Sequence, residues 1–335
     1  MLRTRLCLSL WALVMSQIWP ASARAIFVSA TGQTDTLQSA LVQAGTGITV
    51  QNLNLTSAGF GSTGTYSNSS NTYGIQSGIV ISTGHVLDYH DSIQQTTEGS
   101  YYYVVAATSA QNGLLAPITG TSSNWDATQI DISFDMQSGY DGIRFLLVFG
   151  TEEYPDFVGG QFSDAFGAYL NGSNIALVSS QPINSNNSSM ANVPGTILNG
   201  VLTNPSGTPG PYIHEISASV ANGSSGNVLR IVLGDALDGS LDSTVFIAQL
   251  SGIPASPPLK PGDYNQDGVV DAADYVAWRK TDGTPAGYNA WRTHFGQSSG
   301  SGSVAYANAA VPEPTTLVNL IVAAVGIRLR RRDIE

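Results

Sequence analysis

A short acidic stretch near the C-terminal end of the chain has the residue types and the spacing of a calcium-binding loop. Side-chain oxygens recur at its first, third, fifth, ninth and twelfth positions, Gly268 occupies the sixth, and a backbone carbonyl is due at the seventh. An EF-hand loop uses this ladder of ligands, and its glycine makes the tight turn. The predicted ligands of one Ca²⁺ ion are Asp263, Asn265, Asp267, Val269, Asp271 and Asp274.

The twelfth position of this loop carries Asp274, where the common EF-hand has Glu. An aspartate reaches a metal less easily with both oxygens, so the change bears on affinity more than on the identity of the ion. The alternative interpretation is an acidic surface turn that contains a glycine. Five matched oxygen positions together with Gly268 favour the calcium loop over that turn.

Two further acidic stretches lie in the long N-terminal part of the chain, each next to a strongly apolar run. Clustered carboxylates raise each other's pKa unless a cation or hydrogen-bond donors intervene. Two interpretations stay open: a structural Ca²⁺ that joins the two turns, or solvated loop ends capped by backbone amides. A glycosidase pair that includes Glu152 or Glu153 is disfavoured, because any long acidic β-rich chain offers such pairs. The residues are Glu152, Glu153, Asp156 and Asp164 in one stretch and Asp235, Asp238 and Asp242 in the other.

The residues after the calcium loop predict two short helices. A helical run opened by Asp274 continues to Lys280, and its Tyr-x-Ala-Trp-Arg pattern, which starts at Tyr275, recurs at Tyr288. The lead-in to the second copy lacks the acidic ladder, so the module is expected to hold one ion.

The part of the chain from residue 26 to residue 253 predicts a mainly β fold. One early stretch, Asp35 to Ala44, has the spacing of a short amphipathic helix with Asp35 as its N-cap. After it the apolar residues alternate with a period of two, and turn residues separate the runs. Such strands predict an antiparallel β-sandwich of the jelly-roll kind, in which the run 145–149 is a central strand buried on both faces. The predicted strands contain residues 130–136, 143–149, 229–233 and 245–250.

The composition excludes several classes of function. The formal net charge is −11, and residues 26–255 contain sixteen acidic residues against Arg144 and Arg230. Such a surface repels nucleic acids and anionic lipids and attracts divalent cations, so no nucleic-acid partner is expected. Cys7 is the only cysteine, which excludes disulfides, thiol catalysis and Cys-ligated metals from the rest of the chain.

The two ends of the chain predict export and sorting. Residues 1–25 begin with Arg3 and Arg5, continue with a short apolar run and end with small-x-small sites, and therefore predict a secretory signal peptide. A proline-rich linker at 254–261 and a flexible linker at 298–310 flank the module at 262–297. Residues 311–335 contain a Pro-Glu-Pro motif, an apolar stretch and an arginine cluster. The motif consists of Val311, Pro312, Glu313 and Pro314.

Three stretches resemble the choice-of-anchor L domain. They begin at Gly78 (GIVISTG), at Val148 (VFGTEEYPDFVGGQFSDAFG) and at Leu233 (LGDALDGSLDSTVF). The resemblance covers most of residues 30–250 and implies attachment to a bacterial surface, without implying an activity.

The C-terminal segments resemble two other families. The loop and its paired helices are similar to a degenerate dockerin type I module of the kind seen in planctomycete surface proteins, which implies calcium-stabilised folding and a cohesin-like partner. The tail resembles a PEP-CTERM sorting signal, which implies recognition by an exosortase-type enzyme at the inner membrane. Its apolar stretch, residues 315–327, is short for a membrane span, and its arginines would stay cytoplasmic.

Together these features predict an exported, non-enzymatic protein of the cell surface, envelope or extracellular matrix. It would be anchored transiently to the membrane through its C-terminus. The alternative is a carbohydrate-binding or polysaccharide-degradation accessory protein, or a glycoside hydrolase, because dockerins usually accompany polysaccharide degradation. A surface polysaccharide would then be the partner. A structural matrix or adhesion protein is a third class.

Overall fold

The computed structural model describes residues 26–69, 71–89, 103–191, 198–255 and 260–298. The predicted signal peptide and the predicted sorting tail, including Val311 to Pro314, lie outside these residues. The chain divides into two compact units, one ending at Ala255 and the other starting at Ser256, and each is described by itself.

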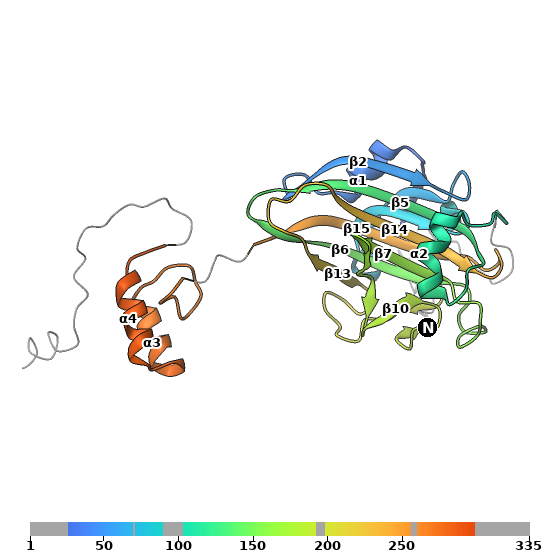
Figure 1. Cartoon of the computed structure of the whole chain (residues 1–335). Coiled ribbons are helices and arrows are strands. Elements are labelled where there is room, and N and C mark those ends of the chain that lie inside the picture. Colours follow the sequence, from blue (N-terminus) through green and yellow to red (C-terminus); the bar gives the residue numbers. More distant parts are fainter. Residues whose placement is uncertain (1–25, 70, 90–102, 192–197, 256–259, 299–335) are drawn as a thin grey trace, which may run out of the picture. The chain divides into compact units, whose positions relative to one another are not determined.

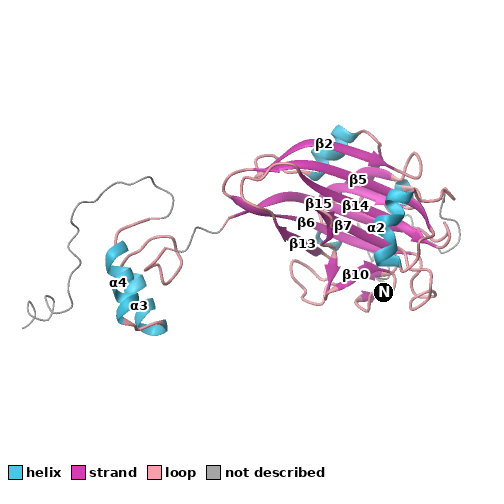
Figure 2. Cartoon of the chain, viewed as in Figure 1, coloured by secondary structure: helices cyan, strands magenta, loops and turns pink. Residues whose placement is uncertain are grey.

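The first unit is built of two antiparallel sheets (Figures 1 and 2). The first sheet has the order β1 (Phe27–Ala30), β3 (Thr63–Ser67), β4 (Ser77–Ser82), β15 (Ser243–Pro254), β6 (Tyr140–Thr151), β13 (His214–Ser219). The second has the order β2 (Ile48–Thr56), β5 (Asn124–Met136), β14 (Asn227–Ala236), β7 (Ala165–Leu170), β10 (Gln181–Asn184), β9 (Leu177–Val178), and β8 (Ser173–Asn174) pairs with β7. A small third sheet pairs β11 (Met190–Ala191) with β12 (Val201–Leu202).

The main hydrophobic core lies between the two large sheets. Its side chains come from alternate positions of the strands, which point to one face because successive residues of a strand point to opposite faces. Ile130, Ile132 and Phe134 of β5 enter it from one sheet, and Phe145 and Leu147 of β6 enter it from the other. The predicted β-sandwich is confirmed, while its comparison with a jelly roll stays a prediction.

A second layer of packing covers the outer face of the first sheet. Val80, Val148 and Phe246 point to this face and are fully buried against residues outside the strands, such as Tyr73 and Ile213. The expected central strand at 145–149 is therefore confirmed, because β6 buries side chains on both of its faces.

The first helix, α1 (Thr34–Leu41), buries Leu37 and Leu41 in the main core as its spacing predicts. Its boundaries differ from the prediction. Gln33 is the N-cap, Asp35 lies inside the first turn, and the helix ends at Leu41 instead of Ala44. The helix stops there because Val42 turns extended and forms a β-bridge with Leu250.

The second helix, α2 (Ser109–Thr119), covers the outer face of the second sheet, where Leu115 and Ile118 pack against Val232. A capping box of Thr108 and Gln111 begins the helix. Two 3₁₀ turns, η1 (Thr72–Gly74) and η2 (Val86–Tyr89), complete the helical elements described in this unit.

The second unit contains the predicted pair of helices, α3 (Ala272–Thr281) and α4 (Pro285–His294). Their interface is aromatic, and neighbouring ring centroids of Tyr275, Tyr288 and Trp291 lie 5.1 to 6.2 Å apart. The indole of Trp291 also donates to the carbonyl of Asp271 at 2.7 Å, which fastens the second helix to the end of the acidic loop. No helix among the described residues is long and apolar enough to cross a membrane.

Gly78 provides a test of the packing between β4 and β15. A Cβ atom at this position would collide with the backbone carbonyl of Ile247 on the neighbouring strand. We predict that Gly78→Ala lowers the free energy of unfolding by about 2–3 kcal/mol, because a packed sheet relaxes poorly around added volume.

Gly113→Ala is the matched control, since Gly113 is exposed within α2 and a Cβ atom there meets nothing within 4 Å. It should stabilise the chain by about 0.5–1 kcal/mol through helix propensity. Urea unfolding followed by circular dichroism measures both changes, and equal effects from the two substitutions would contradict the strand register.

Candidate metal centres in an acidic loop and at the end of the sandwich

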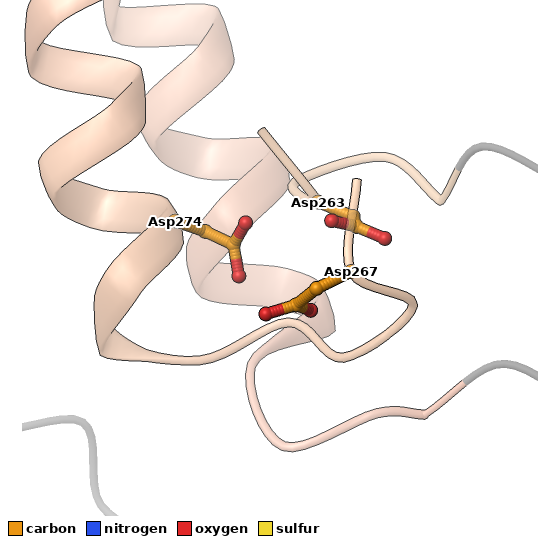
Figure 3. A group of neighbouring side chains, drawn as sticks. All are labelled: Asp263, Asp267 and Asp274. Atoms are coloured by element: carbon orange, nitrogen blue, oxygen red, sulfur yellow. The ribbon is translucent and has the colours of Figure 1, made fainter. Parts of the chain in front are cut away.

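Three of the predicted calcium ligands gather in the second unit. Asp263, Asp267 and Asp274 each place one carboxylate oxygen so that the three atoms lie within 4.8 Å of one another, around a common space (Figure 3). Among the described residues, Asp263, Asp267 and Asp274 form the group of three acidic side chains whose oxygens lie close enough together to bind one metal ion. The spacing recognised in the sequence therefore corresponds to a physical cluster.

Asp274 is the fixed side of this loop. It is fully buried, and its Oδ1 accepts hydrogen bonds from the backbone amides of Tyr264 at 2.8 Å and Asn265 at 3.0 Å. Its Oδ2 accepts from the amide of Asp271 at 2.8 Å, which completes a capping box at the start of α3. Helix α3 accordingly begins at Ala272, after Asp271 as N-cap, and not at Asp274 as the sequence pattern predicted.

Asp263 closes the loop from the other side. Its Oδ2 accepts from the amide of Gly268 at 3.0 Å, while its Oδ1 is buried and accepts no hydrogen bond. Gly268 has a φ of 87°, in the left-handed region that glycine adopts without strain, which explains the glycine at the sixth position.

The remaining predicted ligands lie along the same loop. Asp267 accepts from the amide of Val269 at 2.9 Å and from the side-chain amide of Asn265 at 2.8 Å. Asp271 accepts from the amide of Ala273 at 2.7 Å, so its carboxylate serves as the helix cap. Loop and cap thus hold the acidic side chains in place through backbone donors.

The other acidic residues singled out in the sequence collect at one end of the sandwich. Glu152 and Glu153 directly follow β6, and Asp242 directly precedes β15. The Asp242 amide donates to Oε2 of Glu152 at 3.2 Å, and the Glu152 amide donates to the carbonyl of Asp242 at 3.0 Å. These three residues flank two neighbouring strands of the first sheet.

The second sheet supplies Asp164, directly before β7, and Asp235, near the end of β14. Oδ1 of Asp164 accepts from the amide of Ala236 at 3.1 Å, and its Oδ2 accepts from the hydroxyl of Ser243 at 2.9 Å. Because Ser243 begins β15, this second hydrogen bond joins the two sheets.

Burial separates the seven predicted residues into two groups. Glu152, Glu153, Asp164, Asp235 and Asp242 are at most 2% exposed. Asp156 and Asp238 are exposed, and Asp238 accepts a hydrogen bond from the Ser240 amide of its own turn. The five buried residues are therefore not solvated, although Glu152 and Asp164 do accept hydrogen bonds from backbone amides. Glu152, Glu153, Asp164 and Asp242 lie within two residues of a core strand and Asp235 lies inside one, and all five are shielded from solvent.

Burial raises the pKa values of these carboxyls, since a charge in a low-dielectric interior is disfavoured. Burial and then the neighbouring acidic groups raise the pKa of Glu153 to about 9 and that of Asp242 to about 9. Burial raises the pKa of Asp164 to about 7 and takes that of Asp235 well above its usual range.

The structure adds Asp126 to the group. This residue is fully buried on β5, and its carboxylate accepts from the amides of Val104 at 3.1 Å and Val105 at 2.6 Å. Burial raises its pKa as well. One signal was present in the sequence. Asp126 is an even number of residues before Ile130 and Ile132, whose side chains face the core, so the alternation of a strand would direct Asp126 to the same face.

Two packed antiparallel sheets with buried acidic residues at one end define a large β-sandwich module. The sequence profile of the choice-of-anchor L domain matches residues 28–202, more than half of the chain, and the chain belongs to that family. The family indicates a cell-surface or exported protein. No curated protein and no solved structure matches the chain. The matched range ends before β14 and β15, although these strands lie inside the two sheets and complete them.

The raised pKa values predict how stability depends on pH when divalent cations are removed by a chelator. Between the unfolded carboxyl pKa near 4 and the folded values of 7 to 9, the folded state holds more protons than the unfolded state. Stability must therefore fall as pH rises through this window. We predict a loss of up to about 1.4 kcal/mol per tenfold change in proton concentration for each carboxyl that stays protonated only in the folded state.

Asp242→Asn should flatten this decline, because the amide cannot ionise. Asp156→Asn, an exposed change in the neighbouring acidic stretch, should leave it unaltered. Thermal unfolding from pH 5 to pH 9 in chelator measures the three slopes. A flat profile for the unsubstituted chain would contradict the burial of these carboxyls.

Proposed function

We propose that the chain is an exported, surface-associated, non-enzymatic protein that displays its β-sandwich and carries one Ca²⁺ in the loop 263–274. The observation that carries the calcium proposal is the convergence of Asp263, Asp267 and Asp274 within 4.8 Å. Three carboxylates at that separation repel one another, and a hard divalent cation with oxygen ligands relieves the repulsion.

The orphaned Oδ1 of Asp263 supports the same proposal. This oxygen is buried without a hydrogen bond, whereas the oxygens of Asp274 already have backbone donors. A bound Ca²⁺ would supply its missing partner. Asn265, Asp267, Asp271 and the Val269 carbonyl would complete the oxygen ligands. The resemblance to dockerins adds a cohesin-like domain as the partner of this module.

The proposal that the protein is non-enzymatic draws support from the state of the acidic residues in the sandwich. Glu152 and Glu153 are each 2% exposed. A glycosidase needs its two carboxyl groups on either side of a bound sugar, so side chains closed off from solvent serve structure better than hydrolysis.

The tail provides the proposed route to the surface. Val311 to Pro314, the apolar stretch and the arginine cluster would be recognised by an exosortase-type enzyme while the arginines remain on the cytoplasmic side of the inner membrane. These residues lie outside the described part of the chain, so this element of the proposal rests on the sequence.

Calorimetric titration of the whole chain with Ca²⁺ tests the loop. We predict that Asp263→Ala removes one binding site, because it deletes the ligand at the first position and a hydrogen bond to the glycine turn. At a concentration one hundred times Kd, the lost ion corresponds to about 2.7 kcal/mol of stability in the helical module.

Asp282→Asn is the control for this substitution. Asp282 is exposed in the lead-in to the second helix, where it accepts from the Tyr264 hydroxyl at 3.1 Å, and an amide can keep that hydrogen bond. The control should bind as many ions as the unsubstituted chain. Identical titrations for Asp263→Ala and the unsubstituted chain would refute calcium binding at the loop.

Deleting residues 311–335 tests the proposed sorting. Without the apolar stretch and the arginines, the protein should appear in the culture medium instead of the cell fraction. Deleting residues 262–297, which leaves the tail in place, should not change the fraction. Unchanged cell association after removal of the tail would show that another part of the chain does the attaching.

A further inference from the structure

A second group of carboxylates, distinct from the loop, lies where the two sheets of the sandwich meet at one end. Asp164 and Asp235 enter it from the second sheet, and Asp242 enters it from the first. Each of the three is 1% exposed. Acidity alone does not define a site, so the hydrogen-bond partners of each oxygen matter.

Those partners are unevenly distributed. Both oxygens of Asp164 accept hydrogen bonds, one from Ala236 and one from Ser243. Both oxygens of Asp235 and both oxygens of Asp242 are buried and accept none, although nearly all buried polar atoms in proteins have partners. Four orphaned carboxylate oxygens in one small region call for a ligand that the chain itself does not supply.

The chain offers no Lys or Arg for these carboxylates. Arg144 and Arg230 are the only such residues from 26 to 255. Arg144 is exposed and stands opposite Ser217 in the middle of β6, and Arg230 lies 3.8 Å from Asp131 across β5 and β14. Both are several residues along their strands from the acidic end. The compensating charge must therefore come from solution.

We propose that Asp164, Asp235 and Asp242 hold a divalent cation, of the Ca²⁺ class, between the two sheets, with Glu152, Glu153 and Asp126 around it. All of these donors are oxygens, which hard cations prefer over the softer transition metals. The exposed Asp238, which lies close enough to act on Glu153 electrostatically, marks an acidic entrance from solvent.

The width of the site favours Ca²⁺ over Mg²⁺. Among the described residues, the group with three acidic ligand atoms within 4.8 Å is the one in the loop 263–274, so the sandwich carboxylates stand further apart. Binding one ion would require the side chains to rotate closer together, and the oxygens of Asp242 accept no hydrogen bond that this rotation would break. Ca²⁺ accepts six to eight oxygens at about 2.3–2.6 Å in flexible geometry, whereas Mg²⁺ demands a near-ideal octahedron.

An ion at this position would link segments far apart in the sequence. It would join the residue before β7, the end of β14 and the residue before β15, and therefore both sheets. Because the unfolded chain does not preserve such a site, binding and folding of the sandwich become coupled.

The test uses the whole chain with Asp263→Ala, which silences the loop and leaves the sandwich unchanged. After equilibration with Ca²⁺ and removal of free ion, elemental analysis should find one Ca²⁺ per chain. A chelator should lower the midpoint of the β-sheet transition, followed by circular dichroism, by at least about 4 °C. Absence of both retained calcium and a chelator effect in this parent would overturn the proposal.

Variants added to the same parent locate the ion. Asp235→Asn, which preserves shape, should abolish the retained calcium and the chelator effect, and Asp242→Asn provides a second variant if the first does not fold. Asp156→Asn, an exposed change, should preserve both. Calcium that persists in Asp235→Asn and Asp242→Asn would contradict this location.

The same variants distinguish neutralisation of the carboxylates by a cation from neutralisation by protons. If shared protons neutralise the cluster, chelator does nothing and Asp235→Asn raises the midpoint at pH 8, because it removes a group whose ionisation is costly. Failure of the loop proposal can be distinguished from failure of the sandwich proposal. The loop is tested by the difference in bound calcium between the unsubstituted chain and Asp263→Ala, and the sandwich site is tested within Asp263→Ala.

Discussion

The sandwich depends on neutralising acidic side chains that its own strands carry into the interior. Five carboxyls are buried where β6, β7, β14 and β15 begin or end, and unpaired buried charges cost several kcal/mol each. The apolar core between the sheets does not change this cost. Some external compensation, by cation or by proton, is therefore a condition for closing this end of the fold.

The two acidic sites meet that condition to different degrees. In the loop, Asp274 receives three backbone amide hydrogen bonds, and the glycine turn and the capping box hold it before any ion arrives. In the sandwich, Asp164 is similarly satisfied, but Asp235 and Asp242 are not. The loop is thus prearranged by local hydrogen bonds, whereas the sandwich site depends on contacts between distant segments. A single ion would affect stability more strongly in the second case, because it crosses from sheet to sheet.

Much of the fold could be predicted from the sequence because its signals are local. The alternation in 130–136 and 143–149 specifies strands with one core face, and the spacing from Asp263 to Asp274 specifies a loop whose geometry is set within twelve residues. The end of α1 could not be found in this way, since it depends on a bridge between Val42 and Leu250. The burial of Glu152 and Asp235 depends on how the two sheets stack, and no local sequence pattern predicts this stacking. Asp126 could be found only by noticing that an acidic residue occupies a position of the strand pattern that faces the core.

A crystal structure of the whole chain grown with Ca²⁺, with anomalous scattering recorded at long wavelength, tests the central claim most directly. The account predicts an anomalous peak between the sheets, with Asp164, Asp235 and Asp242 turned toward it at about 2.3–2.6 Å. Density with no peak there, in which these carboxyls pair through short hydrogen bonds between their oxygens, would contradict it.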